Sequence, residues 1–342
     1  MESNQDDSQA FVRAMEAFLV SLLPMALKAA IQLGVLDILQ AAETGKDGDD
    51  NRLSAMEIAA QVQGRTTSLE QTASSLNRIL RVLAEHGLLS ASSTSSTGTR
   101  YSLSLSLSLN CSRRFQNELF WHTAMNLNAY SKLEEAVLHG NSPFAMAHGT
   151  TFYPFTQQNH AYNQVFQKAM SGHSQLFMTK LLDTYAGLQT IRSLVDVGGG
   201  YGDCLRAITS RYPHLKGINL ELPHIVANAP AYPAGHIYEF IKMQWVLHNL
   251  KDDDCLKVLK NCHKSLPTHG KIIIIETLLP NTTENIPSNN RISLYMDVVM
   301  LAVLGGKSRT QEEFENLSIR AGFTKVELVH IIYGMSVLEI SK

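Results

Sequence analysis

Apolar positions recur at two different spacings along the chain, helical in the first third and strand-like further on. Between residues 10 and 39 the apolar side chains follow helical spacing and cover more than one face of a helix. Two more helices are predicted at Ser54–Gln61 and Ser68–His86. Each begins with a serine followed three residues later by Glu or Gln, which is the spacing of a capping box. Serine and leucine alternate from Tyr101 to Leu107, which predicts one strand of a hairpin.

The second half of the chain alternates strands with helices. Two long helical stretches come first, Phe115–His139 and Tyr162–Tyr185. Short apolar runs then predict the strands Ser193–Val197, Lys216–Leu220, Tyr238–Val246, Lys271–Glu276, Lys325–Tyr333 and Ser336–Ile340. This order predicts an α/β fold whose doubly wound sheet is mostly parallel, with an antiparallel hairpin at one edge. In such sheets ligands bind beyond the carboxyl ends of the strands.

A length of 342 residues suits two domains. We predict a mainly helical, winged-helix-like domain over residues 1–112 and an α/β domain over residues 113–342. Winged helices elsewhere bind DNA. Here the second predicted helix carries Glu70 and Glu85 besides Arg78 and Arg81, and the net charge is −2. Nucleic acid is therefore not expected as a partner.

The composition is that of an ordinary globular protein, with 44% hydrophobic and 18% charged residues. The N-terminus is acidic and polar, and no uninterrupted apolar run reaches about 18 residues. Neither a secretory signal nor a membrane span is therefore predicted. The four cysteines form no C-x-x-C pair and are interpreted as reduced thiols. We expect a cytoplasmic protein.

A glycine cluster carries the clearest chemical signal. Leu194–Val197 predicts a short buried strand, and Gly198, Gly200 and Gly202 follow it. Glycines let the backbone turn sharply and approach a ligand without a Cβ in the way. The helix predicted next presents unpaired N–H groups in its first turn. Together these features predict a cradle for a nucleotide-type cofactor.

The spacing of the glycines separates two classes of cofactor. The dinucleotide fingerprint G-x-G-x-x-G would need glycine at position 203, where the chain has Asp203. The motif present is D-x-G-x-G-x-G, which resembles the first motif of S-adenosylmethionine (SAM) dependent methyltransferases. Glu221, about 20 residues further on, is placed to bind ribose hydroxyls, a feature that both classes share.

Further blocks extend this resemblance over most of the chain. The run N-L-E-L-P-H at Asn219–His224 resembles the I-N-F-D-L-P-H of plant caffeic acid type O-methyltransferases, the metal-independent class II family, with Glu for Asp. Other matching blocks are Trp245–Asn249, Leu256–Leu266, Lys271–Pro280, Asp297–Leu301, Gly305–Lys307 and Arg309–Thr310. The resemblance implies a Rossmann-like SAM methyltransferase domain, with SAM as cofactor. It also implies an N-terminal dimerisation domain that exchanges helices between the subunits of a homodimer.

His248 is the candidate general base. It ends an apolar strand, and it matches the catalytic histidine of the family in L-H-D or L-H-N. A base of pKa near 6.5 assists deprotonation of a phenol, whose pKa is about 10, at neutral pH. Glu276 ends the next strand and would hold the other ring nitrogen, as the carboxylate of a triad does. The alternative is a structural histidine at a strand end.

The resemblance implies further site residues. Those for the cofactor are Gly198, Gly200, Gly202, Glu221, Leu222, Gln244 and Ser174. Those for the acceptor are Met125, Asn126, Phe166, Met170 and His173, which suit a small aromatic such as a phenylpropanoid, flavonoid or alkaloid. Met and Phe at this spacing also fit simple packing. Asp252, Asp253 and Asp254 suggest magnesium, but three acids at a helix start complement the helix dipole, and no metal is expected.

The chain departs from the family at the cofactor side. The family's strand ending in G-D-M-F, which contacts adenine, has no counterpart between Glu221 and Tyr238. Gln244 replaces a lysine, and Ser308 replaces a second glutamate. These changes predict reduced or absent turnover. The alternative to an active O-methyltransferase is an impaired homologue that serves as a dimerisation partner. A third hypothesis, an NAD-dependent dehydrogenase, is disfavoured by Asp203.

Overall fold

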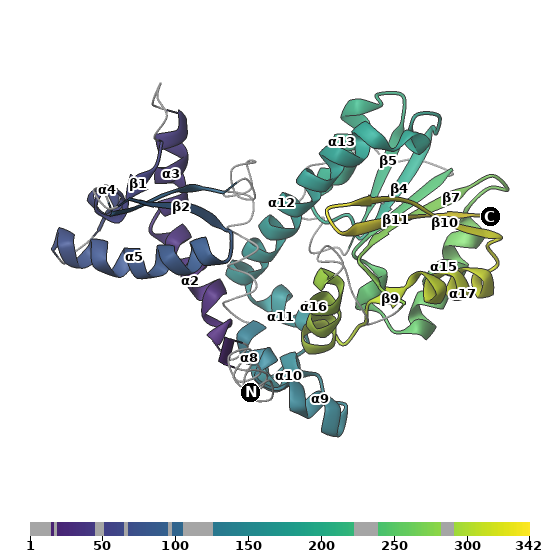
Figure 1. The fold of residues 1–342 in the computed structure, drawn as a ribbon. Helices are drawn as coiled ribbons and strands as arrows, with labels where there is room; N and C mark the ends of the chain where they lie inside the picture. Colours follow the sequence, from purple (N-terminus) through teal and green to yellow (C-terminus); the bar gives the residue numbers. More distant parts are fainter. Residues whose placement is uncertain are drawn as a thin grey trace, which may run out of the picture. The chain divides into compact units, whose positions relative to one another are not determined.

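The structure is a computed structural model. It describes residues 15–16, 19–44, 51–64, 68–94, 98–104, 126–221, 239–281 and 291–342. The chain divides into two compact units, Met1–Thr123 and Ala124–Lys342 (Figure 1). The domain boundary expected after residue 112 stays a prediction, because residues 105–125 lie outside these ranges.

The first unit packs helices against a small antiparallel sheet. Its elements are α2 (Leu22–Gln32), α3 (Val35–Thr44), β1 (Leu53–Ser54), α4 (Ala55–Gln61), α5 (Leu69–Glu85), β2 (Leu89–Thr94) and β3 (Gly98–Leu103). The strands lie in the order β1-β3-β2. Leu36, Leu80 and Tyr101 are among the buried residues of its core. The helices predicted after Ser54 and Ser68 and the hairpin are confirmed, whereas residues 10–14, 17–18 and 105–107 of the predicted elements lie outside the described residues.

The helix boundaries of the first unit follow from local chemistry. Ser54 and Glu57 form a reciprocal capping box at the start of α4, and the Ser68 hydroxyl accepts a hydrogen bond from Gln71 N at 3.2 Å. The apolar stripe expected over residues 10–39 is divided between α2 and α3, because Gly34 adopts a φ of 72°. Within the described ranges no helix by itself has the length and hydropathy of a membrane span. Among these residues, only α2 taken together with Val35–Glu43 has that length and hydropathy, and the two helices are bent by 65° relative to each other.

A six-stranded sheet organises the second unit. Its strands are β4 (Ser193–Val197), β5 (Lys216–Leu220), β6 (Phe240–Gln244), β7 (Lys271–Glu276), β10 (Lys325–Ile332) and β11 (Met335–Ser341). They lie in the order β10-β11-β7-β6-β4-β5. The pairs from β5 to β7 are parallel, whereas β11 is antiparallel to both β7 and β10. The predicted mixed sheet with an antiparallel edge hairpin is confirmed.

Helices cover both faces of this sheet (Figure 1). Residues of α12 (His160–Thr184) and α13 (Asp203–Arg211) form a core with Ile273 and Ile275. Residues of α15 (Asp252–Ser265) and α17 (Gln311–Ala321) pack with Ile272 and Ile274 on the opposite face. The alternation of isoleucines in β7 follows from the two-residue period of a strand that is buried on both sides.

Shorter elements connect these layers. They are α8 (Asn126–Tyr130), α9 (Leu133–His139), α10 (Pro143–His148), α11 (Phe152–Gln158), α16 (Arg291–Val299), β8 (Leu278–Leu279), β9 (Arg309–Thr310), two 3₁₀ turns at Ala186–Leu188 and Leu247–Asn249, and a π-helical turn at Met300–Leu304. The continuous helix predicted to reach His139 is wrong in its described part, because α8 and α9 are separate. The other long helix is confirmed as α12, of 25 residues.

Candidate active site

The glycine-rich turn after β4 has the strained backbone that only glycine adopts readily. Gly198, Gly200 and Gly202 have φ values of 67°, 57° and 78°. Gly202 is the N-cap of α13, whose first residue is Asp203. Asp203 accepts a hydrogen bond from Ser171 of α12. The turn therefore ends at a helix N-terminus, where unpaired N–H groups and the helix dipole favour electron-rich ligand atoms.

The end of β5 closes one side of this turn. The Asn219 side-chain amide donates to Gly200 O at 2.9 Å, and Glu221 accepts from Gly200 N at 3.0 Å. A Cβ at residue 199 would lie 2.1 Å from Asn219 Oδ1, so this position has no room for a side chain. The Glu221 carboxylate thus lies at the glycine turn, as the sequence predicts for a ribose-binding acid.

His248 lies in a 3₁₀ turn beyond β6, and this turn contacts the glycine turn. A Cβ at Gly198 would lie 2.7 Å from Val246 Cγ2, only two residues before His248. His248 is buried, with 5% of its surface exposed. Its Nδ1 lies 3.2 Å from Glu276 Oε2 at the end of β7. The structure therefore brings the two predicted catalytic residues together at the carboxyl ends of the parallel strands.

Glu276 uses its two carboxylate oxygens differently. Oε1 accepts three backbone N–H groups, from Val246 and Leu247 at 3.1 Å each and from His248 at 3.3 Å. Oε2 faces the imidazole, but its angle to Nδ1 is not that of a hydrogen bond, and neither atom has another partner in the described part of the chain. Catalytic hydrogen bonds often tighten only in the loaded enzyme.

Burial dominates the titration of this pair. It lowers the pKa of His248 to about 3, with the positive charge of Arg309 acting in the same direction. Burial raises the pKa of Glu276 to about 8, against the three backbone N–H groups and Arg309, which favour the carboxylate. At pH 7 Glu276 therefore holds its proton while the His248 ring is neutral, and the carboxylate forms as the pH rises through about 8.

An aromatic stack extends from the base to α12. The Trp245 ring is stacked on His248, with centroids 6.3 Å apart, and lies 4.1 Å from the ring of His173. Trp245 has a φ of 55°, an unusual value for a bulky residue that costs about 1–3 kcal/mol. Trp245 Nε1 and His173 Nδ1 are buried and have no hydrogen-bond partner among the described residues. Of the predicted acceptor residues, His173 is thus the one that the structure joins to the base.

The other predicted acceptor residues lie on neighbouring helices. Asn126 is fully buried on α8, where its Oδ1 accepts from Tyr162 at 3.4 Å. Phe166 packs edge-on against Phe152 at 5.1 Å, and Met170 follows on α12. Met125 and Leu222 lie outside the described residues. The sequence did not single out Phe152, whose aromatic character was the one available signal.

Gln244 and Ser174 are bound to each other. Gln244 Nε2 donates to Ser174 Oγ at 3.2 Å, and Gln244 Oε1 accepts from Cys204 Sγ at 3.4 Å. Two residues earlier on the same face of β6, Lys242 forms a buried ion pair with Asp196 at 3.0 Å. Both residues predicted to bind the cofactor therefore take part in a polar cluster beneath the glycine turn. Their cofactor contact stays a prediction.

A distant segment completes the surroundings of His248. Lys307 N donates to His248 O at 2.9 Å, and a Cβ at Gly306 would lie 1.9 Å from the same carbonyl. Ser308, which replaces the family's second glutamate, is buried, and its hydroxyl has no partner within the described ranges. The acids at the start of α15 include Asp252, which pairs with Arg309 at 2.7 Å. No three metal-ligating side chains converge in the part of the chain that the structure describes.

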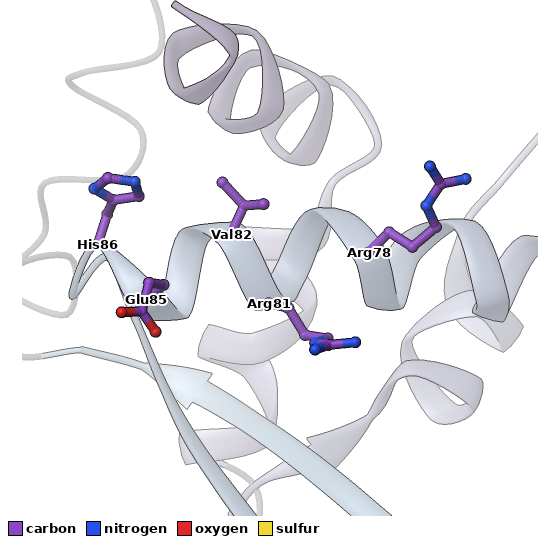
Figure 2. Close-up of a pocket in the computed structure, with 5 residues that line it drawn as sticks. All are labelled: Arg78, Arg81, Val82, Glu85 and His86. Carbon is purple, nitrogen blue, oxygen red and sulfur yellow. The ribbon is translucent and has the colours of Figure 1, made fainter. Parts of the chain in front are cut away.

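A hollow of about 400 Å³ lies on α5 of the first unit, lined by Arg78, Arg81, Val82, Glu85 and His86. Figure 2 shows Arg78 and Arg81 pointing to different sides of the helix, so their charges do not converge. All five lining residues belong to one helix and its last turn. The hollow contains none of the predicted catalytic or cofactor residues.

The described residues fit a nucleoside cofactor. The glycine turn lacks side chains where a ligand would approach, an acid lies at its edge, and the base turn contacts it. This combination is that of a Rossmann-like domain that binds a nucleoside cofactor. Residues 130–324 match the O-methyltransferase domain, and residues 15–106 match the O-methyltransferase dimerisation domain. The chain belongs to this O-methyltransferase family.

Full-length relatives agree with this assignment. The chain is 37% identical to desmethyl-yatein O-methyltransferase of Sinopodophyllum hexandrum, covering 98% of the chain and 99% of the relative. It is 35% identical to caffeic acid 3-O-methyltransferase of Catharanthus roseus, covering 99% and 96%. Human N-acetylserotonin methyltransferase, solved in complex with SAM, shares the fold, with a TM-score of 0.77 at 19% identity over 98% of both chains.

These matches confirm a SAM-dependent O-methyltransferase and do not favour an inactive dimerisation partner. The alignment with the first relative spans 357 positions, 15 more than the 342 residues of this chain, so at least that many positions have no counterpart here. β5 is the last strand at its edge of the sheet among the described residues. A lost edge strand after Glu221 is consistent with both observations and stays a prediction.

Proposed function

We propose that the enzyme methylates a phenolic hydroxyl of a small aromatic plant metabolite, with His248 and Glu276 as the base. The observation that carries this proposal is the contact of Val246 with Gly198, because it puts the base turn against the glycine turn. The names of the relatives, desmethyl-yatein and caffeic acid O-methyltransferases, support a phenolic acceptor of phenylpropanoid, flavonoid or alkaloid type.

SAM supplies a methyl group on a sulfonium, an electrophile whose leaving group is a neutral thioether. The protein's task is then to bring the acceptor oxygen into line and to remove its proton. Gly198, Gly200, Gly202 and Glu221 would hold the cofactor. The rings of Phe166 and His173 and the side chain of Met170 would hold a flat acceptor between apolar surfaces.

The proton of the acceptor would pass to His248, and Glu276 would stabilise the resulting imidazolium. The pair carries one negative charge before this step and none after it, so no net charge is created in the buried site. Because the pKa of Glu276 is raised to about 8, the pair is free to accept a proton only above that pH. The rate is therefore expected to rise as the pH increases to about 8 and to level off beyond it.

A homodimer is the second part of the proposal. It is supported by the dimerisation domain matched at residues 15–106. In the described part of that unit, Leu19, Val20 and Leu22 are 54%, 50% and 59% exposed. Apolar side chains this exposed at the start of a helix suit a subunit interface. Light scattering should give twice the chain mass of 37.9 kDa.

The test of the proposed reaction is transfer of labelled methyl from SAM to a panel of catechols and methoxyphenols. The wild type is compared with His248→Asn and Glu276→Gln. Loss of a general base should lower kcat by about 10²–10⁴-fold. His269→Asn, an exposed histidine of the same unit, should leave kcat unchanged. Binding of SAM without transfer to any phenol, or His248→Asn as active as wild type, would contradict the proposal.

A further inference from the structure

Arg309 is a fully buried arginine in a part of the chain that the sequence did not single out for chemistry. It opens β9, which pairs in parallel with β8, so that Arg309 lies opposite Leu278. Leu278 is two residues beyond Glu276. The β8–β9 pair thus fixes the backbone of Arg309 close to the end of β7, from which Glu276 reaches the base.

The guanidinium of Arg309 binds backbone carbonyls that lie before and after His248 in the sequence. Nη1 donates to Leu247 O at 2.9 Å, and Nη2 donates to Leu250 O at 2.8 Å. Nε and Nη2 also donate to Asp252 Oδ1, at 2.9 and 2.7 Å. The two carbonyls bracket the base in the sequence. Only the planar, five-donor fork of arginine can reach them and the carboxylate at once.

Arg309 and Glu276 hold complementary groups of the same turn. The Glu276 carboxylate accepts the N–H groups of Val246, Leu247 and His248. The Arg309 guanidinium takes the carbonyls of Leu247 and Leu250. A carboxyl group that binds the N–H groups and a cation that binds the carbonyls leave little freedom for the imidazole. Charge-assisted hydrogen bonds of this kind are about twice as strong as neutral ones.

The charged and titratable groups around His248 come from several elements. Glu276 belongs to β7, Arg309 to β9, Asp252 and Cys255 to α15, and His173 reaches the stack from α12. Lys307 follows Gly306, and its ammonium pairs with Asp252 and Glu313. Arg309 also pairs with Asp252, but its guanidinium is the cation whose charge acts on both His248 and Glu276. Its charge lowers the pKa of both His248 and Glu276.

We propose that Arg309 is a positioning residue for the base pair. It fixes the turn that carries His248, and its charge favours the form of the pair that is free to accept the acceptor's proton. This inference rests on the proposed role of His248 as base. Arg309 touches neither of the reacting groups, so its effect is exerted through the turn and through the electrostatic potential at the pair.

The test compares Arg309→Lys and Arg309→Met with the wild type. Arg309→Met should lower kcat about 100-fold, since misplacement by about 1 Å has this effect, while the KM for SAM stays the same. The acid limb of its pH profile for kcat/KM should move up by about 1 pH unit. Arg309→Lys keeps the charge without the fork, so its acid limb should stay near that of the wild type although kcat falls. Arg320→Met, on the exposed end of α17, is the matched control.

Asp252 is 49% exposed and keeps Lys307 as a partner, so neither variant leaves a buried carboxylate unpaired, and both are expected to fold. Circular dichroism and thermal melting check this. An unshifted acid limb in folded Arg309→Met would overturn the inference. So would a fall in kcat that merely follows the fraction of folded protein in both variants.

A second readout does not depend on turnover. With histidine labelled by ¹³C and ¹⁵N, the His248 ring signals are assigned by their absence in His248→Asn. The pH midpoint at which these signals change should be higher in Arg309→Met than in the wild type and nearly unchanged in Arg309→Lys. Equal midpoints in all three proteins would refute Arg309 as the residue that tunes the pair. A wild type that is inactive on every phenol would defeat the proposed function but leave this titration decisive.

Discussion

The base turn (residues 245–250) and the cofactor turn (residues 198–202) meet at the carboxyl ends of the parallel strands, but different groups hold them in place. Side chains from three elements bind the peptide groups around His248, namely Glu276, Arg309 and Asn249. The glycine turn is shaped mainly by its own backbone, and Glu221 and Asn219 are the side chains bound to Gly200. The first region is therefore expected to be rigid and the second adaptable. Damage to the first should appear in kcat, and damage to the second in the affinity for SAM.

The largest effect is expected beneath the cofactor turn. Lys242→Met would leave Asp196 buried without its cation, at a cost of about 3–5 kcal/mol in the free energy of unfolding. The control is Lys257→Met, because the Lys257–Asp254 pair is 74% and 53% exposed. It should change stability by less than about 1 kcal/mol. Urea unfolding of both variants measures the difference, and equal stabilities would show that the buried pair does not support the turn.

Acid should destabilise the base turn through His248. Its pKa is lowered to about 3 in the folded protein from the ordinary 6.5, so the folded state stays neutral while the unfolded chain takes a proton. This contribution is intact above pH 6.5 and is lost as the pH falls towards 3. Between pH 7 and 4.5 it amounts to about 2.5 kcal/mol. His248→Asn should therefore lose that much less stability than the wild type over this interval.

Glu276 acts in the opposite sense. Its pKa is raised to about 8, so its contribution is present at pH 4.5 and is lost as the pH rises through 8. The comparison of wild type with His248→Asn is informative because both proteins keep Glu276. Urea unfolding at the two pH values gives the difference. Parallel losses of stability in both proteins would show that His248 is not held neutral by burial.

A pair of glycines separates backbone strain from displacement of the base. Gly305 has a φ of 69° but open space around its Cβ position, whereas a Cβ at Gly306 would lie 1.9 Å from His248 O. Gly306→Ala should cost about 1–3 kcal/mol in stability and lower kcat at least about tenfold. Gly305→Ala should cost about 1 kcal/mol and leave kcat nearly intact. Steady-state kinetics of both variants test this expectation. Similar kcat values would mean that the carbonyl of His248 is not part of a rigid turn.

The smallest effect is expected at the ribose-binding acid. Glu221→Gln removes a charge that accepts from Gly200 N at 3.0 Å. The affinity for SAM should fall by about 1 kcal/mol, or roughly fivefold, without a change in kcat. Calorimetry measures the affinity, with the exposed Glu312→Gln as control. A fall in kcat instead of affinity would contradict the division between the two regions.

Local patterns predicted the sheet and the two catalytic residues. The apolar runs of β6 and β7 are long enough to identify buried strands; Glu276 ends β7, and His248 lies four residues beyond the end of β6. The sequence also placed the glycine turn, because positive φ values limit the choice of residue. These features depend on neighbours within a few positions of each other in the sequence.

Features made by distant contacts were not predictable in this way. Arg309 is 61 positions from His248, and long-range contacts such as the β8–β9 pair and the hydrogen bond from Lys307 N to His248 O bring it to the base turn. The stack of His173 on Trp245 depends on how α12 lies on the sheet, and the positive φ of Trp245 has no local signature. The separation of α8 from α9 likewise contradicts a continuous apolar pattern. Tertiary packing overrode helix propensity there.

The most direct test of the account is a crystal structure with S-adenosylhomocysteine and a phenolic acceptor, both at saturating concentration. The account predicts that the nucleoside lies on the turn from Gly198 to Gly202 and that its sulfur faces the acceptor oxygen. That oxygen should be within hydrogen-bond distance of the His248 ring. A nucleoside bound elsewhere, or a His248 ring turned away from the acceptor, would contradict it.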